Sequence, residues 1–189
     1  MSFLEEFIFA GFGGQGIMSI GQVLAYGAIE KGLEVAWIPA YGPESRGGTA
    51  YATVIVSDEQ IGSPTTKSPT GTIIMNGPSY DKFIPMIRPG GLAVINGDLC
   101  SQARLREDIT EIRVPCQILA KEAGSDQVAA MVALGCFIGM KPLIDRDLIE
   151  FGILHTFPGK EKFLPLNMKA IDFGFQVTEK FLASVAVAK

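Results

Sequence analysis

Residues 10–19 are Ala10-Gly11-Phe12-Gly13-Gly14-Gln15-Gly16-Ile17-Met18-Ser19. They follow the apolar run Phe7-Ile8-Phe9 and precede a segment with helical periodicity, so the order is strand, glycine turn, helix. Glycine lets the backbone turn tightly and lets a ligand come close, since no Cβ stands in the way. A helix that begins near Ile17 presents unpaired N–H groups and the positive end of its dipole to the turn. The stretch therefore predicts phosphate binding, although the dipole alone contributes only about 0.3–1 kcal/mol.

The rest of the chain alternates strands and helices over its first two thirds and becomes helical in its last third. Near-continuous apolar runs predict strands at 3–10, 34–38, 51–56, 72–75, 92–95 and 109–114. Helical patterns cover 17–31, 79–87, 126–140 (capped by Ser125), 146–155 and 167–185. This arrangement is typical of a mostly parallel sheet covered on both faces. We therefore expect one α/β domain over residues 1–189, a three-layer α/β/α structure that is Rossmann-like.

The first expected helix has a buried stripe and a signal for its end. Its apolar stripe comprises Ile17, Ile20, Leu24 and Ala28. Its small residues, Gly21, Ala25 and Gly27, should let the helix lie close to the sheet. Gly32 is expected to end it as a left-handed cap.

A second glycine-rich loop accompanies the first. Ligands of such sheets bind beyond the carboxyl ends of the strands, and the loops 11–16 and 42–48 both follow expected strands. The second stretch is Pro39-Ala40-Tyr41-Gly42-Pro43-Glu44-Ser45-Arg46-Gly47-Gly48. Arg46, flanked by glycines, could form a fork-like contact to a phosphate or a carboxylate. Two alternatives remain: a surface loop with a local contact between Glu44 and Arg46, and a first turn that binds nothing.

Composition narrows the classes of partner. The net charge is −4 and no basic block occurs, so nucleic acid is not an expected partner. Residues 1–6 lack the basic region of a signal peptide, and the longest apolar stretch, 128–140, is too short to span a bilayer. Cys100, Cys116 and Cys136 are widely spaced, so neither zinc nor an iron–sulfur cluster is expected. We expect a cytoplasmic protein with reduced thiols, no metal and no membrane contact.

No catalytic set is recognisable. His155, the only histidine, lies in an apolar helical setting and is expected to be structural, and Cys136 is expected in the core. A dinucleotide site usually has an acid at the end of the second strand, but here that strand runs to Pro39 without one, and Glu34 lies at its start. The pattern favours a phosphate over NAD. It suggests a chain that binds a ligand while another chain performs the chemistry.

The two loops, in this order and at this spacing, resemble the gamma subunit (gamma domain) of the 2-oxoacid:ferredoxin oxidoreductases of the 2-oxoglutarate, 2-ketoisovalerate and pyruvate type. The likeness extends over nearly the entire chain. The matching pieces are Gly11-Phe12-Gly13-Gly14-Gln15-Gly16, Tyr41-Gly42-Pro43-Glu44-Ser45-Arg46-Gly47-Gly48, Ile61-Gly62-Ser63-Pro64, Pro89-Gly90-Gly91, Met131-Val132-Ala133-Leu134-Gly135 and Asn167-Met168-Lys169-Ala170-Ile171.

The resemblance implies a function shared among several chains. The family converts a 2-oxoacid and CoA to an acyl-CoA and CO₂ and passes two electrons to ferredoxin. Thiamine diphosphate would lie between alpha and beta subunits, and iron–sulfur clusters would lie in other subunits, including a ferredoxin-like delta subunit. This chain would hold no cofactor alone but would contact CoA. The four-subunit members of the family that this chain resembles most use 2-oxoglutarate or branched-chain oxoacids.

The same resemblance assigns residues to the ligand. Those expected to approach CoA, partly through backbone N–H groups, are Gly13, Gly14, Gln15, Gly16 and Ser19, with Ser45 and Arg46 at its phosphates. The accompanying partner or ligand loop comprises Tyr41, Gly42, Pro43, Glu44, Gly47 and Gly48.

Two rival interpretations stay open: a stand-alone NAD-binding protein, and a scaffold whose loops only pack on partner subunits. The apolar composition, 48% of the chain, also predicts that the isolated protein self-associates or dimerises.

Overall fold

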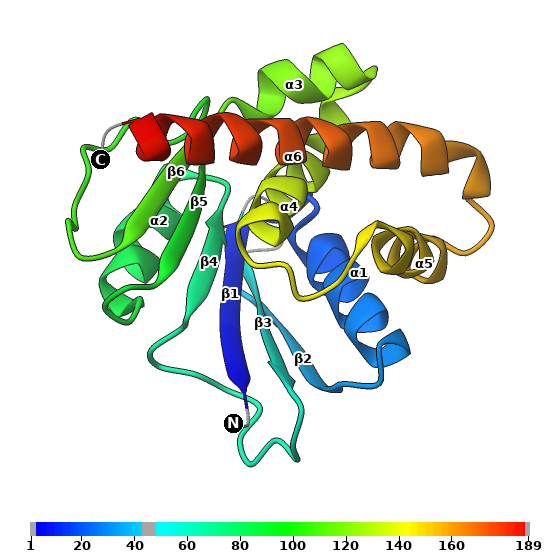
Figure 1. Ribbon diagram of the computed structural model, residues 1–189, viewed down its shortest axis with the longest axis horizontal. Coiled ribbons are helices and arrows are strands. Elements are labelled where there is room, and N and C mark those ends of the chain that lie inside the picture. Colours follow the sequence, from blue (N-terminus) through cyan, green and yellow to red (C-terminus); the bar gives the residue numbers. More distant parts are fainter. Residues whose placement is uncertain (1–2, 43–47, 188–189) are drawn as a thin grey trace.

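The computed structural model describes residues 3–42 and 48–187. In this part of the chain, six strands form one sheet in the order β2-β3-β1-β4-β5-β6 (Figure 1). The strands are β1 (Leu4–Phe12), β2 (Glu34–Tyr41), β3 (Thr49–Ser57), β4 (Gly71–Ile74), β5 (Leu92–Asn96) and β6 (Thr110–Val114). The pairs β1–β4, β4–β5 and β5–β6 are parallel, whereas β3 runs antiparallel to both β1 and β2. The expected α/β architecture is confirmed, but the sheet is mixed.

The helices divide between the two faces of the sheet (Figure 1). One face carries α1 (Ile17–Glu30), α3 (Cys116–Ala123), α4 (Ala129–Met140), α5 (Arg146–Thr156) and α6 (Leu164–Val187). The other face is covered by the short helix α2 (Gly77–Phe83) and the 3₁₀ turn η1 (Ile84–Met86). Two further 3₁₀ turns are η2 (Asp126–Val128) and η3 (Glu161–Phe163).

Alternation along β1 explains why both faces are covered. Phe7 and Phe9 point to the helix-rich face and contact Phe137 edge-on, with ring centroids 5.0 and 5.3 Å away. Ile8 and Ala10 point to the opposite face, toward α2 and η1. Since successive strand residues point to opposite sides, a strand buried on both faces must be apolar throughout.

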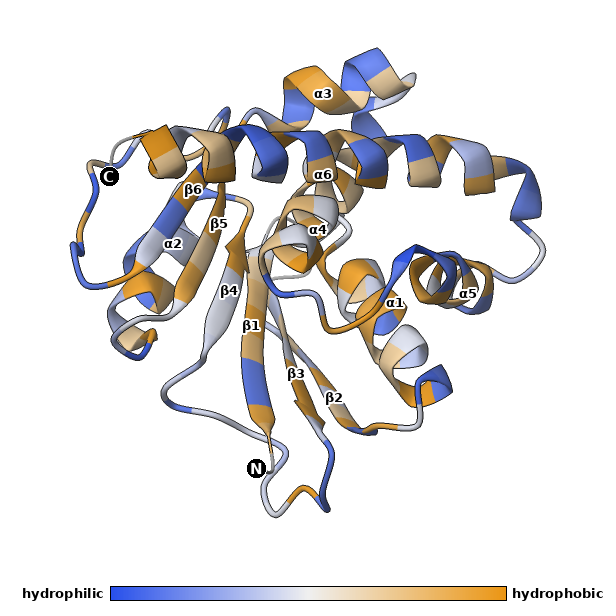
Figure 2. Ribbon diagram, in the orientation of Figure 1, coloured by the Kyte–Doolittle hydropathy of each residue, from blue (hydrophilic) through white to orange (hydrophobic). Residues whose placement is uncertain are grey.

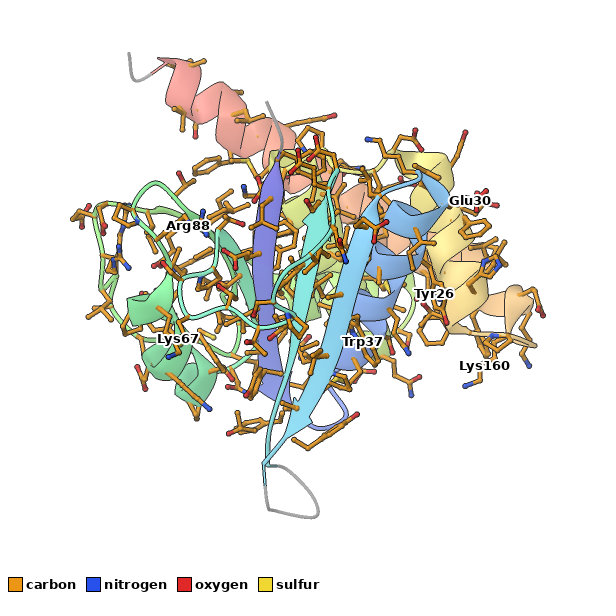
Figure 3. All side chains as sticks on the ribbon, turned by 90° about the horizontal axis from the view of Figure 1, so that it is seen from below. Tyr26, Glu30, Trp37, Lys67, Arg88 and Lys160 are labelled. Carbon is orange, nitrogen blue, oxygen red and sulfur yellow. The ribbon has the colours of Figure 1, made fainter. Side chains whose placement is uncertain are left out.

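Helix α1 behaves largely as its sequence predicts. Its expected stripe is buried, and Gly32 ends the helix with a φ of +85°. A Cβ at Gly21 would lie 2.7 Å from the indole nitrogen of Trp37, so this glycine does allow close packing on the sheet; Figure 3 shows Trp37 on β2 beside α1. Gly27 differs from expectation, because it faces the Leu148 carbonyl of α5 rather than the sheet.

Helix α4 forms the centre of the helical layer. Ten consecutive residues, from Ala129 to Ile138, are buried, and α6 crosses directly over this helix. A Cβ at Gly135 would collide with the Ile171 carbonyl oxygen, and one at Gly174 with that of Val132. The two backbones therefore touch where only glycine fits.

Several boundaries differ from the sequence prediction. The helix α3 was not expected at all; it follows Pro115 and ends at Gly124, whose φ is +132°. Ser125 caps a 3₁₀ turn before α4 rather than α4 itself, by accepting a hydrogen bond from the Gln127 N–H. Helix α6 is longer than the predicted 167–185. Within the described ranges, no helix has the length and apolar character needed to cross a bilayer.

Candidate functional site

The glycine turn connects the end of β1 to the start of α1. Gly14 and Gly16 have φ values of +93° and +81°. Residues with a Cβ adopt this left-handed backbone conformation only at an energetic cost. Gly16 is the residue before the helix and provides no side-chain cap. Among the described residues, the N–H groups of Ile17, Met18 and Ser19 have no hydrogen-bond partner, and the first turn contains no acid. Together these features favour an anion at the helix N-terminus.

The described ends of the second loop, Gly42 and Gly48, lie beside this turn. The Gly13 N–H donates a hydrogen bond of 3.2 Å to the Gly48 carbonyl, and the Gly42 N–H donates one of 2.7 Å to the Thr49 carbonyl. The cause is topological: β3 pairs with β1, with Phe12 opposite Thr49, so the loop that leads into β3 meets the turn that leaves β1. Both loops thus lie at the carboxyl edge of the parallel strands.

A cavity of about 270 Å³ lies at the glycine turn, between the start of α1 and the adjoining ends of β2 and β3. It is lined by Phe12, Gly13, Gly14, Gly16, Ile17, Met18, Ser19, Tyr41 and Ala50. None of these carries a charged side chain, so among the described residues the N-terminus of α1 is the main source of positive potential in this cavity. Tyr41 is 69% exposed at the rim. We call this space the α1 cavity.

The structure brings some predicted site residues into the α1 cavity and not others. Gly13, Gly14, Gly16, Ser19 and Tyr41 line it. Five of the predicted site residues lie outside the described part of the chain: Pro43, Glu44, Ser45, Arg46 and Gly47.

Gln15 lies on the other side of the turn. Its Oε1 accepts hydrogen bonds from the Phe12 N–H (2.6 Å) and from Asn76 Nδ2 (3.2 Å), and its Nε2 donates to the Met75 carbonyl (3.2 Å). Its own N–H donates to the Phe12 carbonyl. The carboxamide therefore joins the glycine turn to the end of β4, and it is not among the residues lining the α1 cavity.

A second cavity, of about 310 Å³, adjoins the turn on this opposite side. It is lined by Gly14, Gln15, Met75, Gln117, Asp126, Gln127 and Ala129. The sequence predicts only a helix start around Asp126, and it gives no sign of Gln117 as a site residue, because α3 was not expected. We call this space the switch-point crevice. It lies between the neighbouring strands β1 and β4, whose following helices, α1 and α2, cover opposite faces of the sheet.

The titratable groups in the core suit structure rather than catalysis. Burial raises the pKa of the Cys100 and Cys136 thiols to about 11, and it raises the pKa of Cys116 well above its ordinary value. At neutral pH all three therefore stay protonated, which makes them poor nucleophiles and poor metal ligands. His155 lies outside the core, exposed on α5, where it stacks on Phe151 with ring centroids 3.8 Å apart. Within the described ranges, no cluster of three or more His, Cys, Asp or Glu side chains could hold a metal ion.

Comparison with known proteins identifies the family of this chain. The family model described as pyruvate ferredoxin/flavodoxin oxidoreductase matches residues 6–177. The chain is 36% identical over 174 residues to ketoisovalerate oxidoreductase subunit VorA of Methanothermobacter marburgensis, covering 92% of this chain and 36% of that protein. It is 31% identical over 180 residues to 2-oxoglutarate synthase subunit KorC of Methanocaldococcus jannaschii, covering 93% of this chain and 95% of that protein.

The chain spans about a third of the length of the VorA proteins it matches.

Solved structures agree with the sequence relatives. The keto/oxoacid ferredoxin oxidoreductase gamma subunit from Geobacter sulfurreducens PCA superposes with a TM-score of 0.80 at 28% identity, covering 93% of this chain and 99% of that one. The 2-oxoglutarate:ferredoxin oxidoreductase from Magnetococcus marinus, with 2-oxoglutarate, coenzyme A and succinyl-CoA bound, gives 0.84 at 26% identity, covering 94% of this chain and 31% of that one. The chain therefore belongs to the pyruvate ferredoxin/flavodoxin oxidoreductase family and has the fold of its gamma subunits.

Proposed function

We propose that this chain is the gamma part of a 2-oxoacid:ferredoxin oxidoreductase. The complex would convert a 2-oxoacid, CoA and oxidised ferredoxin to an acyl-CoA, CO₂ and reduced ferredoxin, with two electrons transferred per turnover. The names of the VorA and KorC relatives support a branched-chain 2-oxoacid or 2-oxoglutarate as the substrate class. Thiamine diphosphate and iron–sulfur clusters would belong to alpha, beta and delta partners, since the three thiols of this chain are buried and do not fit a cluster.

Within that complex, we assign the α1 cavity to the phosphates of CoA. The observation that carries this assignment is the Gly13–Gly48 hydrogen bond, which joins both glycine loops at the N-terminus of α1. Free N–H groups at Ile17, Met18 and Ser19 would donate to phosphate oxygens. The helix dipole contributes only about 0.3–1 kcal/mol, so Ser45 and Arg46 of the adjoining loop are needed for most of the affinity.

The topology disfavours the rival NAD-binding function. In a dinucleotide-binding fold, the second strand pairs with the first, and its terminal acid reaches the ribose of the bound nucleotide. Here β3 lies between β1 and β2, so β2 is displaced to the edge of the sheet. The last residues of β2, Pro39, Ala40 and Tyr41, also include no acid. The order of the strands and this missing acid both favour a phosphate ligand without ribose recognition by β2.

The scaffold function has an observation of its own. The last two turns of α6 are mostly apolar and exposed: Leu182 is 50%, Val185 40% and Val187 89% accessible, and Figure 2 shows this end of the helix as largely hydrophobic. Such a patch fits a contact with a partner subunit. The two functions are compatible, but only the first requires the loops to bind CoA.

The experiment that separates them is an Arg46→Ala variant in the purified native complex. Loss of a charged hydrogen bond to phosphate costs about 1.5–3 kcal/mol, so the KM for CoA should rise about 10- to 150-fold, while the KM for the 2-oxoacid stays constant. Arg146→Ala is the matched control, because it removes a guanidinium whose partner is Asp172 on α6. An intact complex with an unchanged KM for CoA would leave only the scaffold function. Identification of the co-purifying chains tests the complex itself.

A further inference from the structure

The switch-point crevice is a cavity that the phosphate site does not use. It lies beyond the carboxyl ends of β1 and β4, between the glycine turn, the start of α3 and the turn η2. In open α/β sheets, this position, where the strand order reverses, is where ligands bind. A volume of about 310 Å³ is enough for part of a cofactor-sized molecule.

The polar groups of the crevice accept hydrogen bonds more than they donate them. Gln117 Oε1 is buried and has no hydrogen-bond partner among the described residues. The Asp126 carboxylate lies at the exposed rim, beside Gln127. At the start of α3, the N–H groups of Gln117 and Ile118 already donate to the Asp98 carboxylate, at 2.7 and 3.3 Å. An anion would thus meet a carboxylate and, at the start of α3, N–H groups that are already bonded, whereas a group with N–H or O–H donors would satisfy Gln117 and Asp126.

Gly14 connects this crevice to the α1 cavity. It is exposed, it lines both cavities, and a Cβ added to it would meet no atom within 4 Å. A flexible chain attached to a phosphate in the α1 cavity can therefore pass over the bare Gly14 backbone into the crevice. The two sides of the turn differ in electrostatics: the α1 cavity favours an anion, and the crevice favours an uncharged donor.

We propose that the switch-point crevice binds the amide-bearing pantetheine arm of CoA. This inference rests on the proposed function, because it takes the diphosphate to lie in the α1 cavity. The arm leaves the diphosphate directly and carries a hydroxyl and two amide N–H donors, which match the acceptors at Gln117 and Asp126. The adenosine end also has donors, the exocyclic amine and the ribose 2′-hydroxyl, but it carries the 3′-phosphate, an anion that the Asp126 carboxylate at the rim would repel.

The test compares fragments of the ligand on the full chain and uses two variants. Gln117→Met keeps the length of the side chain and removes the acceptor, and Asp126→Asn keeps its size and removes the charge. The probes are CoA, 4′-phosphopantetheine and adenosine 3′,5′-bisphosphate, with dissociation constants from titration calorimetry. Gln176→Met and Asp147→Asn are matched controls at exposed positions on α6 and α5. Thermal unfolding of each variant verifies that it is folded.

We expect both crevice variants to raise the dissociation constants of CoA and 4′-phosphopantetheine by about 3- to 10-fold, the factor for one lost hydrogen bond. The dissociation constant of adenosine 3′,5′-bisphosphate should stay unchanged. Weakening confined to adenosine 3′,5′-bisphosphate and CoA would place adenine in the crevice and overturn the inference. Wild-type affinity for every probe in both variants would overturn it as well, while the phosphate site stands. Failure of the wild-type chain to bind CoA at all would instead reject the proposed function together with this inference.

Discussion

Asn76 Nδ2 donates a hydrogen bond of 3.2 Å to Gln15 Oε1, which joins the end of β4 to the glycine turn that follows β1. Asn76 is itself fixed, because its Oδ1 accepts from the Ser79 N–H and caps α2. The shape of the turn therefore depends on a neighbouring strand as well as on its own glycines. Gln15 acts as a positioning residue for the N-terminus of α1.

The first prediction concerns this contact. Gln15→Ala should lower the free energy of unfolding by about 1–3 kcal/mol, because the Phe12 N–H and the Met75 carbonyl lose their partner in a half-buried place. Urea unfolding measures the change, with Gln60→Ala as a control at an exposed loop position. If Gln15 instead served only as a ligand contact, the variant would keep wild-type stability and lose affinity for CoA.

The second prediction concerns the crossing of α4 and α6. Gly174→Ala should destabilise the protein by about 1–3 kcal/mol, since the new methyl group would collide with the Val132 carbonyl oxygen. The higher helix propensity of alanine offsets at most about 1 kcal/mol of this cost. Gly62→Ala is the control, because an added Cβ there meets nothing within 4 Å. Equal stability of the two variants would show that the helices can separate at no cost.

The third prediction concerns the buried thiols and alkaline pH. Burial raises the pKa of Cys100 and Cys136 to about 11 from an ordinary value of 9.0. The unfolded chain therefore loses these protons at lower pH than the folded chain does. The stabilisation is complete below pH 9 and is lost as the pH rises toward about 11.

Urea unfolding at a series of pH values through this window measures the loss. The double variant Cys100→Ala, Cys136→Ala should have a lower starting stability, because it leaves small cavities, but a shallower decline. An identical decline in the variant and the wild type would assign the alkaline loss to other groups, such as Tyr80, whose pKa is also raised by burial and by its hydrogen bond to Glu111.

The sequence predicts the order of elements well, because their signals are local. The apolar runs and the stripe on α1 mark the core, and Gly32 marks a helix end. The direction of β3 was missed, although its signal was present. Only residues 42–48 separate β2 from β3, and a parallel connection needs a crossover of a dozen residues or more. The short loop therefore dictates a hairpin.

The site was only partly predictable, because its contacts are long-range. The glycines at positions 14 and 16 are enough to predict a turn from the sequence. The role of the Gln15 carboxamide depends on Asn76, which lies far along the sequence and comes close only because β4 pairs with β1. Helix α3, and with it Gln117, was missed because the segment is only eight residues long, even though Pro115 and Gly124 bound it.

Gly16 has a further neighbour, whose position links helix α6 to the glycine turn through helix α4. A Cβ on Gly16 would lie 3.1 Å from the Cβ of Ala130, so the start of α4 abuts the turn. The same α4 touches the α6 backbone at Gly174. Close-packed interiors pass strain on with little give. If a partner subunit displaced α6 by a fraction of an ångström, α4 would therefore transmit the displacement to the glycine turn, where we propose that phosphate binds.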